Sequence, residues 1–175
     1  MTEKQLIDGC LNGERKAQEK LYNLYSRKMM GVCLRYVGDR ETARDMLQEG
    51  FIRVFTSLHL YSGAGQLEAW MRMIFVNCTI EHLRKKDFLR DAVDLDSIKD
   101  LTEEETAVSK IDAGRIMELI QKLPSGFRTV FNLYAIEGYS HREVGEMLHI
   151  SEGTSRSQYA RARQMLQEQI REMGK

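Results

Sequence analysis

Arg156, Arg161 and Arg163 are the side chains whose type and spacing best suit a defined chemical task. A guanidinium group pairs with phosphate oxygens, or with the O6 and N7 atoms of guanine in the major groove of DNA. The three arginines lie in one short segment whose only large apolar residue before Leu166 is Tyr159. Because a solvated helix face has the same composition, the arginines alone leave both interpretations open.

The residues before this segment predict a short capped helix. Ser140 followed by Glu143 forms a capping box, so the helix should begin there. Val144, Met147 and Leu148 then give it a single apolar stripe.

A second helix is expected to follow after a tight turn. Ser151 is a candidate N-cap, and Glu152 suits the positive end of the helix dipole. Gly145 in the first helix allows the two helices to cross closely, since it has no side chain to hold them apart. A basic capped helix set against an apolar capped one is typical of a helix-turn-helix, whose second helix enters the major groove.

Composition indicates an all-α protein in the cytoplasm. Proline occurs once, strand-like alternation is scarce, and the most apolar stretch, 67–80, is interrupted by charged and polar residues. The first ten residues include charged side chains, which argues against a secretory signal. Cys10, Cys33 and Cys78 lack the spacing of a zinc site or a disulfide framework, so neither is expected. We also expect no other metal, no cofactor and no catalytic residue.

The zero net charge of the chain is unevenly distributed. Residues 1–90 have 15 Lys and Arg against 11 Asp and Glu, residues 91–120 have 3 against 9, and residues 121–175 have 8 against 6. We therefore expect two mildly basic helical domains, 1–90 and 111–175, joined by an acidic linker at 91–110. The linker is most simply a solvated connection, although it could also lie against a basic face while DNA is absent.

Two further helices are expected in the first domain. The segment 39–58 has an apolar face that includes Ala43, Leu47, Gly50, Phe51, Val54 and Leu58, and a polar stripe of Asp45, Gln48, Glu49 and Arg53. The helix at about 67–86 should bury Trp70, Met73, Ile74, Val76, Ile80 and Leu83, with Asn77 and His82 on its polar side. It ends in three basic residues, Arg84, Lys85 and Lys86, which suit both the helix dipole and a phosphate. The loop between the helices, 60–66, has the composition of a turn or of a pocket for an unstacked base.

These motifs together resemble a known family. The residues Asp45-x-x-Gln48-Glu49-x-Phe51-x-Arg53-Val54-Phe55, Trp70-Met71 and Asn77-x-x-x-Glu81-x-Leu83-Arg84-Lys85 are similar to region 2 of the extracytoplasmic-function sigma factors. Leu123-Pro124-x-x-Phe127-Arg128-x-Val130-Phe131, Glu137-Gly138-Tyr139-Ser140 and Ser151-Glu152-Gly153-Thr154 are similar to region 4. The resemblance covers about residues 5–86 and 112–170.

The resemblance implies a bacterial RNA polymerase subunit that directs promoter recognition and strand opening, with no small-molecule substrate. Asp45, Gln48, Glu49 and Arg53 would dock on the clamp of the largest polymerase subunit. The melted minus-ten element would be held by Tyr61, Ser62, Gly63, Asn77, Arg84, Lys85 and Lys86. At the minus-thirty-five element, Arg156, Ser157, Ala160 and Arg161 would lie nearest the bases, while Thr154, Ser155 and Arg163 would touch phosphates. An anti-sigma factor is a further expected partner.

The sequence also departs from the family pattern. His149 stands where the turn usually has glycine, and His tolerates a left-handed conformation better than most residues do. Ser155 and Gln158 replace a frequent valine and a frequent arginine, so promoter preference should differ from that of better-known relatives. Gly50 replaces Val or Ala and should weaken its helix slightly.

Two other classes of protein fit parts of the sequence. A free-standing helix-turn-helix regulator accounts for 112–170 but not for the polar stripe of the first domain. A helical metalloenzyme would use the Glu146-x-x-His149 spacing, but a di-iron site needs a second copy of that motif. The methionines could form an adaptable binding surface, although core filling is the simpler interpretation of Met29, Met30, Met46, Met71 and Met73.

Overall fold

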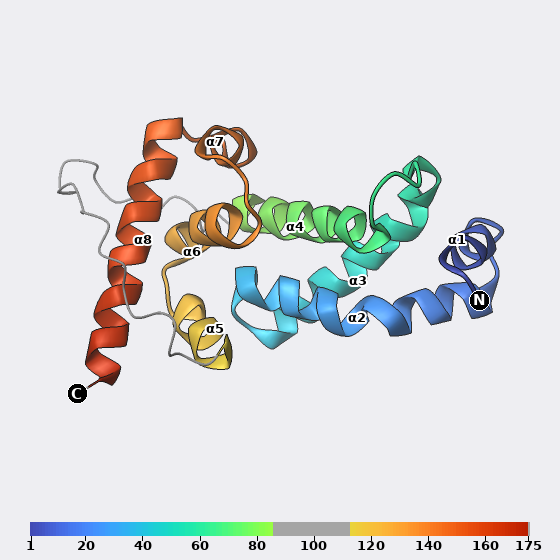
Figure 1. Ribbon diagram of the computed structural model, residues 1–175, viewed down its shortest axis with the longest axis horizontal. Helices are drawn as coiled ribbons and strands as arrows, with labels where there is room; N and C mark the ends of the chain where they lie inside the picture. The colour runs from blue at the N-terminus through green and yellow to red at the C-terminus, as the bar shows by residue number, and fades with distance from the viewer. Residues whose placement is uncertain (86–112, 175) are drawn as a thin grey trace. The chain divides into compact units, whose positions relative to one another are not determined.

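The computed structural model describes residues 1–85 and 113–174 of the 175-residue chain (Figure 1). Within those ranges every regular element is helical, which confirms the all-α prediction. The chain divides into two compact units, Met1–Glu81 and His82–Lys175. Lys86 and the acidic segment 91–110 lie outside the described residues, so the domain boundaries stay predictions.

The first unit is built from α1 (Glu3–Leu11), α2 (Arg15–Val37), α3 (Arg40–Ser57), the 3-10 turn η1 (Leu58–Leu60) and most of α4 (Leu67–Lys85). A short turn joins the two long helices α2 and α3. Gly38 ends α2 with a φ of 78°, a conformation that glycine adopts without steric cost. Asp39 then caps α3, because its Oδ1 accepts a hydrogen bond from the Thr42 amide at 2.8 Å.

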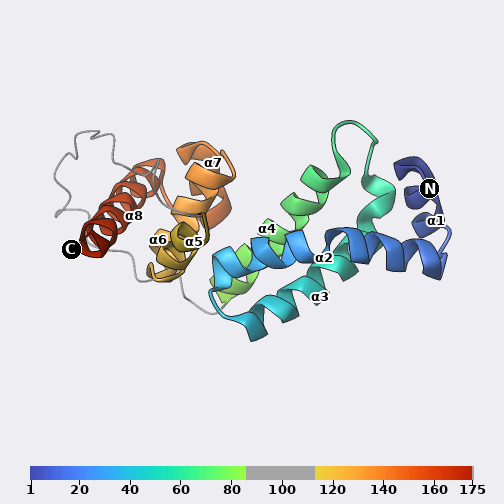
Figure 2. The ribbon, with the colours of Figure 1, turned by 60° about the horizontal axis from the view of Figure 1, so that its bottom comes forward.

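Aromatic rings fill the space between α3 and α4, which lie beside α2 in both views (Figures 1 and 2). Phe75 is fully buried, and its ring meets Phe51 edge to face at a centroid distance of 5.2 Å. Gly50 makes room for that ring, since a Cβ there would lie 2.2 Å from Cε1 of Phe75. The glycine therefore has a packing function in addition to its expected cost in helix propensity.

The predicted core of α4 is wrong at Met73 and is only partly met at Trp70 and Ile74, which are half-buried. Met73 is 47% exposed, whereas Met71, Phe75 and Cys78 are buried. The buried residues follow a spacing of three and four, but apolar side chains occur all around this helix. The sequence pattern therefore could not decide which face of α4 meets the rest of the unit.

The described part of the second unit contains α5 (Ala113–Gln121), α6 (Ser125–Phe131), the π-helical turn η4 (Asn132–Ile136), α7 (His141–Leu148) and α8 (Glu152–Met173). Its core joins α5 and α6 to the middle of α8. The buried members of this core are Leu119, Ile120, Leu123, Phe127, Ala162 and Leu166. The apolar side of α8 is thereby packed against α5 and α6, while its other side takes no part in this core.

The turn between α7 and α8 has the geometry that the sequence predicts. Ser140 and Glu143 form both hydrogen bonds of the capping box, at 3.2 and 2.9 Å, and the Ser151 hydroxyl accepts from the Thr154 amide at 3.0 Å. His149 ends α7 in the left-handed region, with a φ of 56° and a ψ of 42°. A Cβ at Gly145 would lie 2.7 Å from the carbonyl oxygen of Ile150. The close crossing that was expected at this glycine is therefore confirmed.

Candidate nucleic-acid interface

The face of α8 that points away from the core carries Arg156, the exposed one of its three predicted basic contacts. Buried positions recur at Ser155, Gln158, Ala162 and Leu166, which leaves the opposite face of the helix accessible. Arg156 lies on this accessible face with 62% of its side chain exposed, and it forms an ion pair with Glu152 one turn earlier. An exposed ion pair of this kind contributes at most about 1 kcal/mol, so Arg156 can exchange its partner for a phosphate or a base.

The other predicted contacts of this helix differ in exposure. Ser157, Ala160, Arg161 and Arg163 are half-buried, and Arg161 donates a hydrogen bond to Gln164 at 3.0 Å. Thr154 is half-buried as well, and its Oγ1 lies 2.8 Å from the Ser151 hydroxyl. Ser155 is 0% exposed and faces α7. Its side chain is therefore placed apart from the other predicted DNA contacts.

The loop before α4 has a defined closed shape. The Tyr61 hydroxyl donates to the Gly65 carbonyl at 2.8 Å, and the Ala64 amide donates to the Ser62 hydroxyl at 3.3 Å. Gly63 and Gly65 have φ values of 77° and 88°, which favour glycine over other residues. Ser62 and Gly63 are exposed at the tip of this loop, so its backbone is available to a ligand.

Aromatic contact anchors this loop to α4. The ring of Tyr61 packs on Trp70 at a centroid distance of 5.5 Å. Nearby, Lys28 of α2 forms an ion pair of 2.7 Å with Glu68 in the first turn of α4. The loop is thus attached to the helix that follows it through side chains as well as through the chain itself.

The remaining predicted minus-ten contacts are spread along α4. Asn77 is exposed in its middle, whereas Arg84 and Lys85 lie in its last turn. A helix of 19 residues is about 28 Å long, so the structure does not bring the loop and the basic end together. Any ligand that touches all three parts must be extended.

The predicted polar stripe on α3 falls into two parts. Asp45 and Gln48 are exposed, but Arg53 is engaged with two carboxylates, Glu49 at 3.0 Å and Glu81 of α4 at 2.7 Å. The hydrogen bond to Glu81 is the main reason why the pKa of Arg53 is raised above its usual value. Arg53 therefore connects α3 to α4 and holds the Glu49 carboxylate in place.

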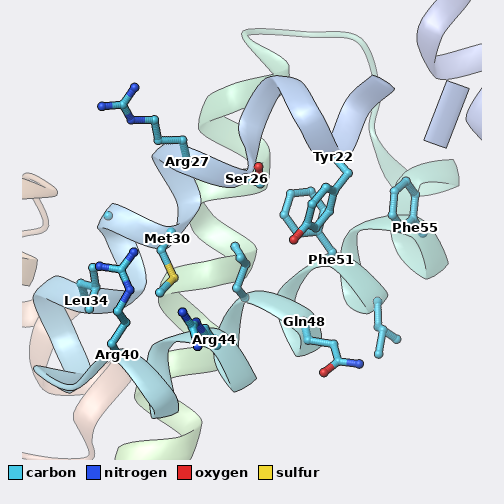
Figure 3. Close-up of a pocket in the computed structure, with 13 residues that line it drawn as sticks. Tyr22, Ser26, Arg27, Met30, Leu34, Arg40, Arg44, Gln48, Phe51 and Phe55 are labelled. Atoms are coloured by element: carbon cyan, nitrogen blue, oxygen red, sulfur yellow. The ribbon is translucent and has the colours of Figure 1, made fainter. Parts of the chain in front are cut away.

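An open groove beside this stripe was missed by sequence reasoning. It has a volume of about 910 Å³ and lies between α2 and α3, with Tyr22, Met30 and Phe51 among its lining residues (Figure 3). Arg27, Arg40 and Arg44 add positive charge to its wall, and Gln48 belongs to both groove and stripe. The feature that points to the groove is a pair of apolar residues on facing helices, Tyr22 and Ile52, which are 41% and 52% exposed.

Two other kinds of feature are absent from the described residues. Among residues 1–85 and 113–174 there is no group of three or more His, Cys, Asp and Glu side chains that could hold a metal ion. His149, which the metalloenzyme interpretation required as a ligand, is the exposed turn residue after α7. Across residues 1–85 and 113–174, no helix combines the length and apolar character of a membrane crossing.

Comparison with known proteins identifies both units. Residues 21–88 match the model of sigma-70 region 2, and residues 113–166 match that of sigma-70 region 4. The ECF RNA polymerase sigma factor SigW of Bacillus subtilis is 30% identical over 183 residues, which cover 97% of each chain. The RNA polymerase sigma-H factor of Pseudomonas aeruginosa is 29% identical, over 94% of this chain and 91% of its own.

A solved structure has the same fold. The sigma factor RpoE of Bartonella quintana, solved in complex with the anti-sigma factor NepR, superimposes with a TM-score of 0.53. It is 18% identical, and the match covers 87% of this chain and 96% of that one. Together with the similarity to SigW, these matches show that the chain belongs to the extracytoplasmic-function sigma factors of the sigma-70 family, which direct RNA polymerase to promoters and start transcription.

Proposed function

We propose that three separate surfaces of this sigma factor divide the work of promoter recognition and opening. The observation that carries the proposal is the accessible basic face of α8, opposite its buried residues. As a sigma factor, the chain is a DNA-binding initiation subunit and not an enzyme. Opening a promoter requires only that binding favour the separated strands over the duplex.

The minus-thirty-five duplex is read by α8. Arg156, Ser157, Ala160 and Arg161 face the bases, and Thr154 and Arg163 position the helix on phosphates. A good bidentate contact between arginine and guanine discriminates by about 1–3 kcal/mol. The exposed position of Arg156 supports its place as the main reader.

The melted minus-ten strand is held by the loop and the polar side of α4. Tyr61, Ser62 and Gly63 receive an unstacked base, Asn77 contacts the strand midway, and Arg84, Lys85 and Lys86 bind phosphates. The separation of about 28 Å along α4 suits an extended single strand. The preset conformation of the loop reduces the entropy lost on binding.

The clamp of the largest polymerase subunit is bound by Asp45, Gln48, Glu49 and Arg53. Their exposed and half-buried positions on one side of α3 support this assignment. We further propose that the protein works in the cytoplasm, has domains at 1–90 and 111–175 with a linker at 91–110, and is restrained by an anti-sigma factor. The solved relative bound to such a factor supports the last point.

Run-off transcription with sigma-free bacterial core polymerase tests these assignments on DNA from the source organism. Discrete start sites that share two upstream elements are expected from the wild-type protein. Asp45→Lys together with Glu49→Lys should abolish them, because both changes reverse the charge of proposed polymerase contacts. Glu41→Lys, an exposed change on the same helix but outside the stripe, is the matched control.

The DNA contacts are tested in the same assay. Arg156→Ala should reduce transcription most from templates with the preferred minus-thirty-five bases, whereas Arg171→Ala at the far end of α8 should not. Asn77→Ala should lower activity even on a template that is already melted at its downstream edge. Equal effects of Arg156→Ala and Arg171→Ala would refute the assignment of α8.

A further inference from the structure

A polar pair, the half-buried His141 and the buried Ser155, joins the two helices of the helix-turn-helix. His141 begins α7, and Ser155 lies in the second turn of α8, 14 residues later. Nδ1 of His141 lies 2.9 Å from Oγ of Ser155. Because Ser155 is 0% exposed, its hydroxyl cannot exchange this partner for bulk water.

Aromatic rings from two further positions fix the imidazole. It stacks on Tyr134 of η4 with a centroid distance of 4.0 Å and an interplanar angle of 6°. Tyr159 of α8 packs against Tyr134 at 4.5 Å and against the imidazole at 5.7 Å. The ring of His141 is therefore held by η4 on one side and by α8 on the other.

Two charged residues of α8 face the same ring. Burial lowers the pKa of His141 below its usual 6.5, Arg156 lowers it further, and Glu152 opposes both. The imidazole is thus neutral at physiological pH, with one nitrogen that donates and one that accepts. Nδ1 of the neutral ring can either donate to the Ser155 hydroxyl or accept from it, and both arrangements keep the 2.9 Å contact.

Ser155 immediately precedes Arg156, the most exposed of the proposed base readers. Neighbouring residues on a helix are separated by a rotation of about 100°, so a restraint on the direction of one side chain also sets the direction of the next. We propose that His141 is a positioning residue for reading the minus-thirty-five duplex: held flat on Tyr134, it fixes the rotation of α8 through Ser155 and thereby aims Arg156. This inference rests on the role proposed above for α8.

The test measures discrimination by the complete holoenzyme. Two templates that differ by one base pair, at the position most sensitive to Arg156→Ala, compete for the polymerase, and the ratio of their transcripts is determined. Ser155→Ala removes the hydroxyl, and His141→Phe keeps a ring on Tyr134 but removes the nitrogen. Each should lower the transcript ratio about fivefold to tenfold, the effect of losing most of one base contact.

Thr129→Val is the matched structural control. It removes another hydroxyl that is 0% exposed in the same unit, one that donates to the Ser125 carbonyl within α6 at 2.7 Å. It should lower the unfolding temperature by an amount similar to Ser155→Ala and leave the transcript ratio unchanged. His141→Asn, which restores a hydrogen-bonding group near the position of Nδ1, should recover part of the discrimination.

Several results would overturn the inference. A ratio within about twofold of wild type in both Ser155→Ala and His141→Phe would do so, as would an equal loss in Thr129→Val. If His141→Phe does not fold, Ser155→Ala decides alone, since alanine is well tolerated in a helix. If Arg156→Ala loses discrimination and the His141 and Ser155 variants do not, only the role of His141 is refuted. If Arg156→Ala itself keeps its discrimination, the proposed role of α8 is refuted.

Discussion

Each unit of this sigma factor contains a helix that passes unusually close to its neighbour at a glycine, but the two glycines meet different obstacles. In the first unit, Gly50 faces the ring of Phe75, at 2.2 Å from the position of a Cβ. In the second unit, Gly145 faces the backbone carbonyl of Ile150, at 2.7 Å. A side chain can be replaced by another mutation, whereas a backbone carbonyl in a tight turn cannot.

This difference separates two ways of holding a functional helix. The position of α3, which carries the proposed polymerase contacts, depends on the size of one aromatic ring in a shared core. The position of α8, which carries the proposed base contacts, depends on the backbone of a turn whose next residue, Ser151, is the cap of that helix. We therefore expect that a larger residue at Gly50 can be compensated by a smaller one at Phe75, whereas a larger residue at Gly145 cannot be compensated by a second mutation.

The largest effect is expected for Gly145→Ala. Its methyl group would displace the carbonyl of Ile150 and with it the start of α8, and the second unit should lose about 3 kcal/mol of unfolding free energy. Denaturant unfolding followed by far-ultraviolet circular dichroism measures this loss. Gly153→Ala is the control, because its Cβ would lie 3.9 Å from the Ser151 hydroxyl, an ordinary contact. Equal stability of the two variants would contradict the prediction.

Gly50→Ala should cost the first unit about 2 kcal/mol, and its effect should be relieved by a second change. Phe75→Leu shortens the obstructing side chain, so the double variant should be more stable than the sum of the single effects predicts, by about 1 kcal/mol. Fluorescence of Trp70, the single tryptophan of the chain, reports the unfolding of this unit selectively. Additive effects of the two changes would show that the ring is not the obstacle.

A matched pair of cap removals should have smaller effects, confined to one unit each. Asp39→Ala removes the cap of α3, and Ser140→Ala removes the cap of α7; each should cost about 1 kcal/mol. Trp70 fluorescence should change only in the first variant, while amide exchange in α7 should accelerate only in the second. Changes in both units from one variant would show that the units are not independently stable.

The smallest effect concerns pH and belongs to the second unit alone. The pKa of His141 is lower in the folded chain than its usual 6.5, so the unfolded chain takes up more protons as the pH falls below that value. The neutral ring therefore contributes stability that is complete above about pH 6.5 and is lost on acidification. His141→Phe should remove this dependence from amide exchange in α7 and α8 between about pH 7.5 and 5.5. An unchanged pH profile in that variant would show that a group other than His141 causes the dependence.

The features that could be predicted from the sequence are those that depend on short-range rules. The Ser140 and Glu143 capping box, the Ser151 cap and the left-handed His149 each involve groups within a few residues of one another. Their hydrogen bonds are fixed by local backbone geometry, which residue type and spacing specify. The family resemblance, carried by the motifs of region 2 and region 4, was sufficient to place the function.

The features that were missed depend on which side chains meet after folding. The exposure of Met73, the pairing of Gly50 with Phe75 and the contact between His141 and Ser155 all involve residues on different helices. In α4, apolar residues surround the helix, so no stripe points to its neighbour. In α8, the buried side begins with the polar residues Ser155 and Gln158, so no apolar stripe marks which serine faces α7.

The π-helical turn η4 has a consequence for comparing this chain with its relatives. The Glu137 amide donates to the carbonyl of Asn132, five residues back, at 2.9 Å, so this turn accommodates one residue more than an α-helical turn does. Deletion of one residue from Asn132–Ile136 would let this turn close as an α-helical turn, with the flanking helices keeping their orientation. The side chains inside the turn would change direction, and Tyr134, which stacks on His141, is one of them. A one-residue gap at this point of a sequence alignment would therefore mark relatives in which the direction of Arg156 on α8 does not depend on a ring stacked on His141.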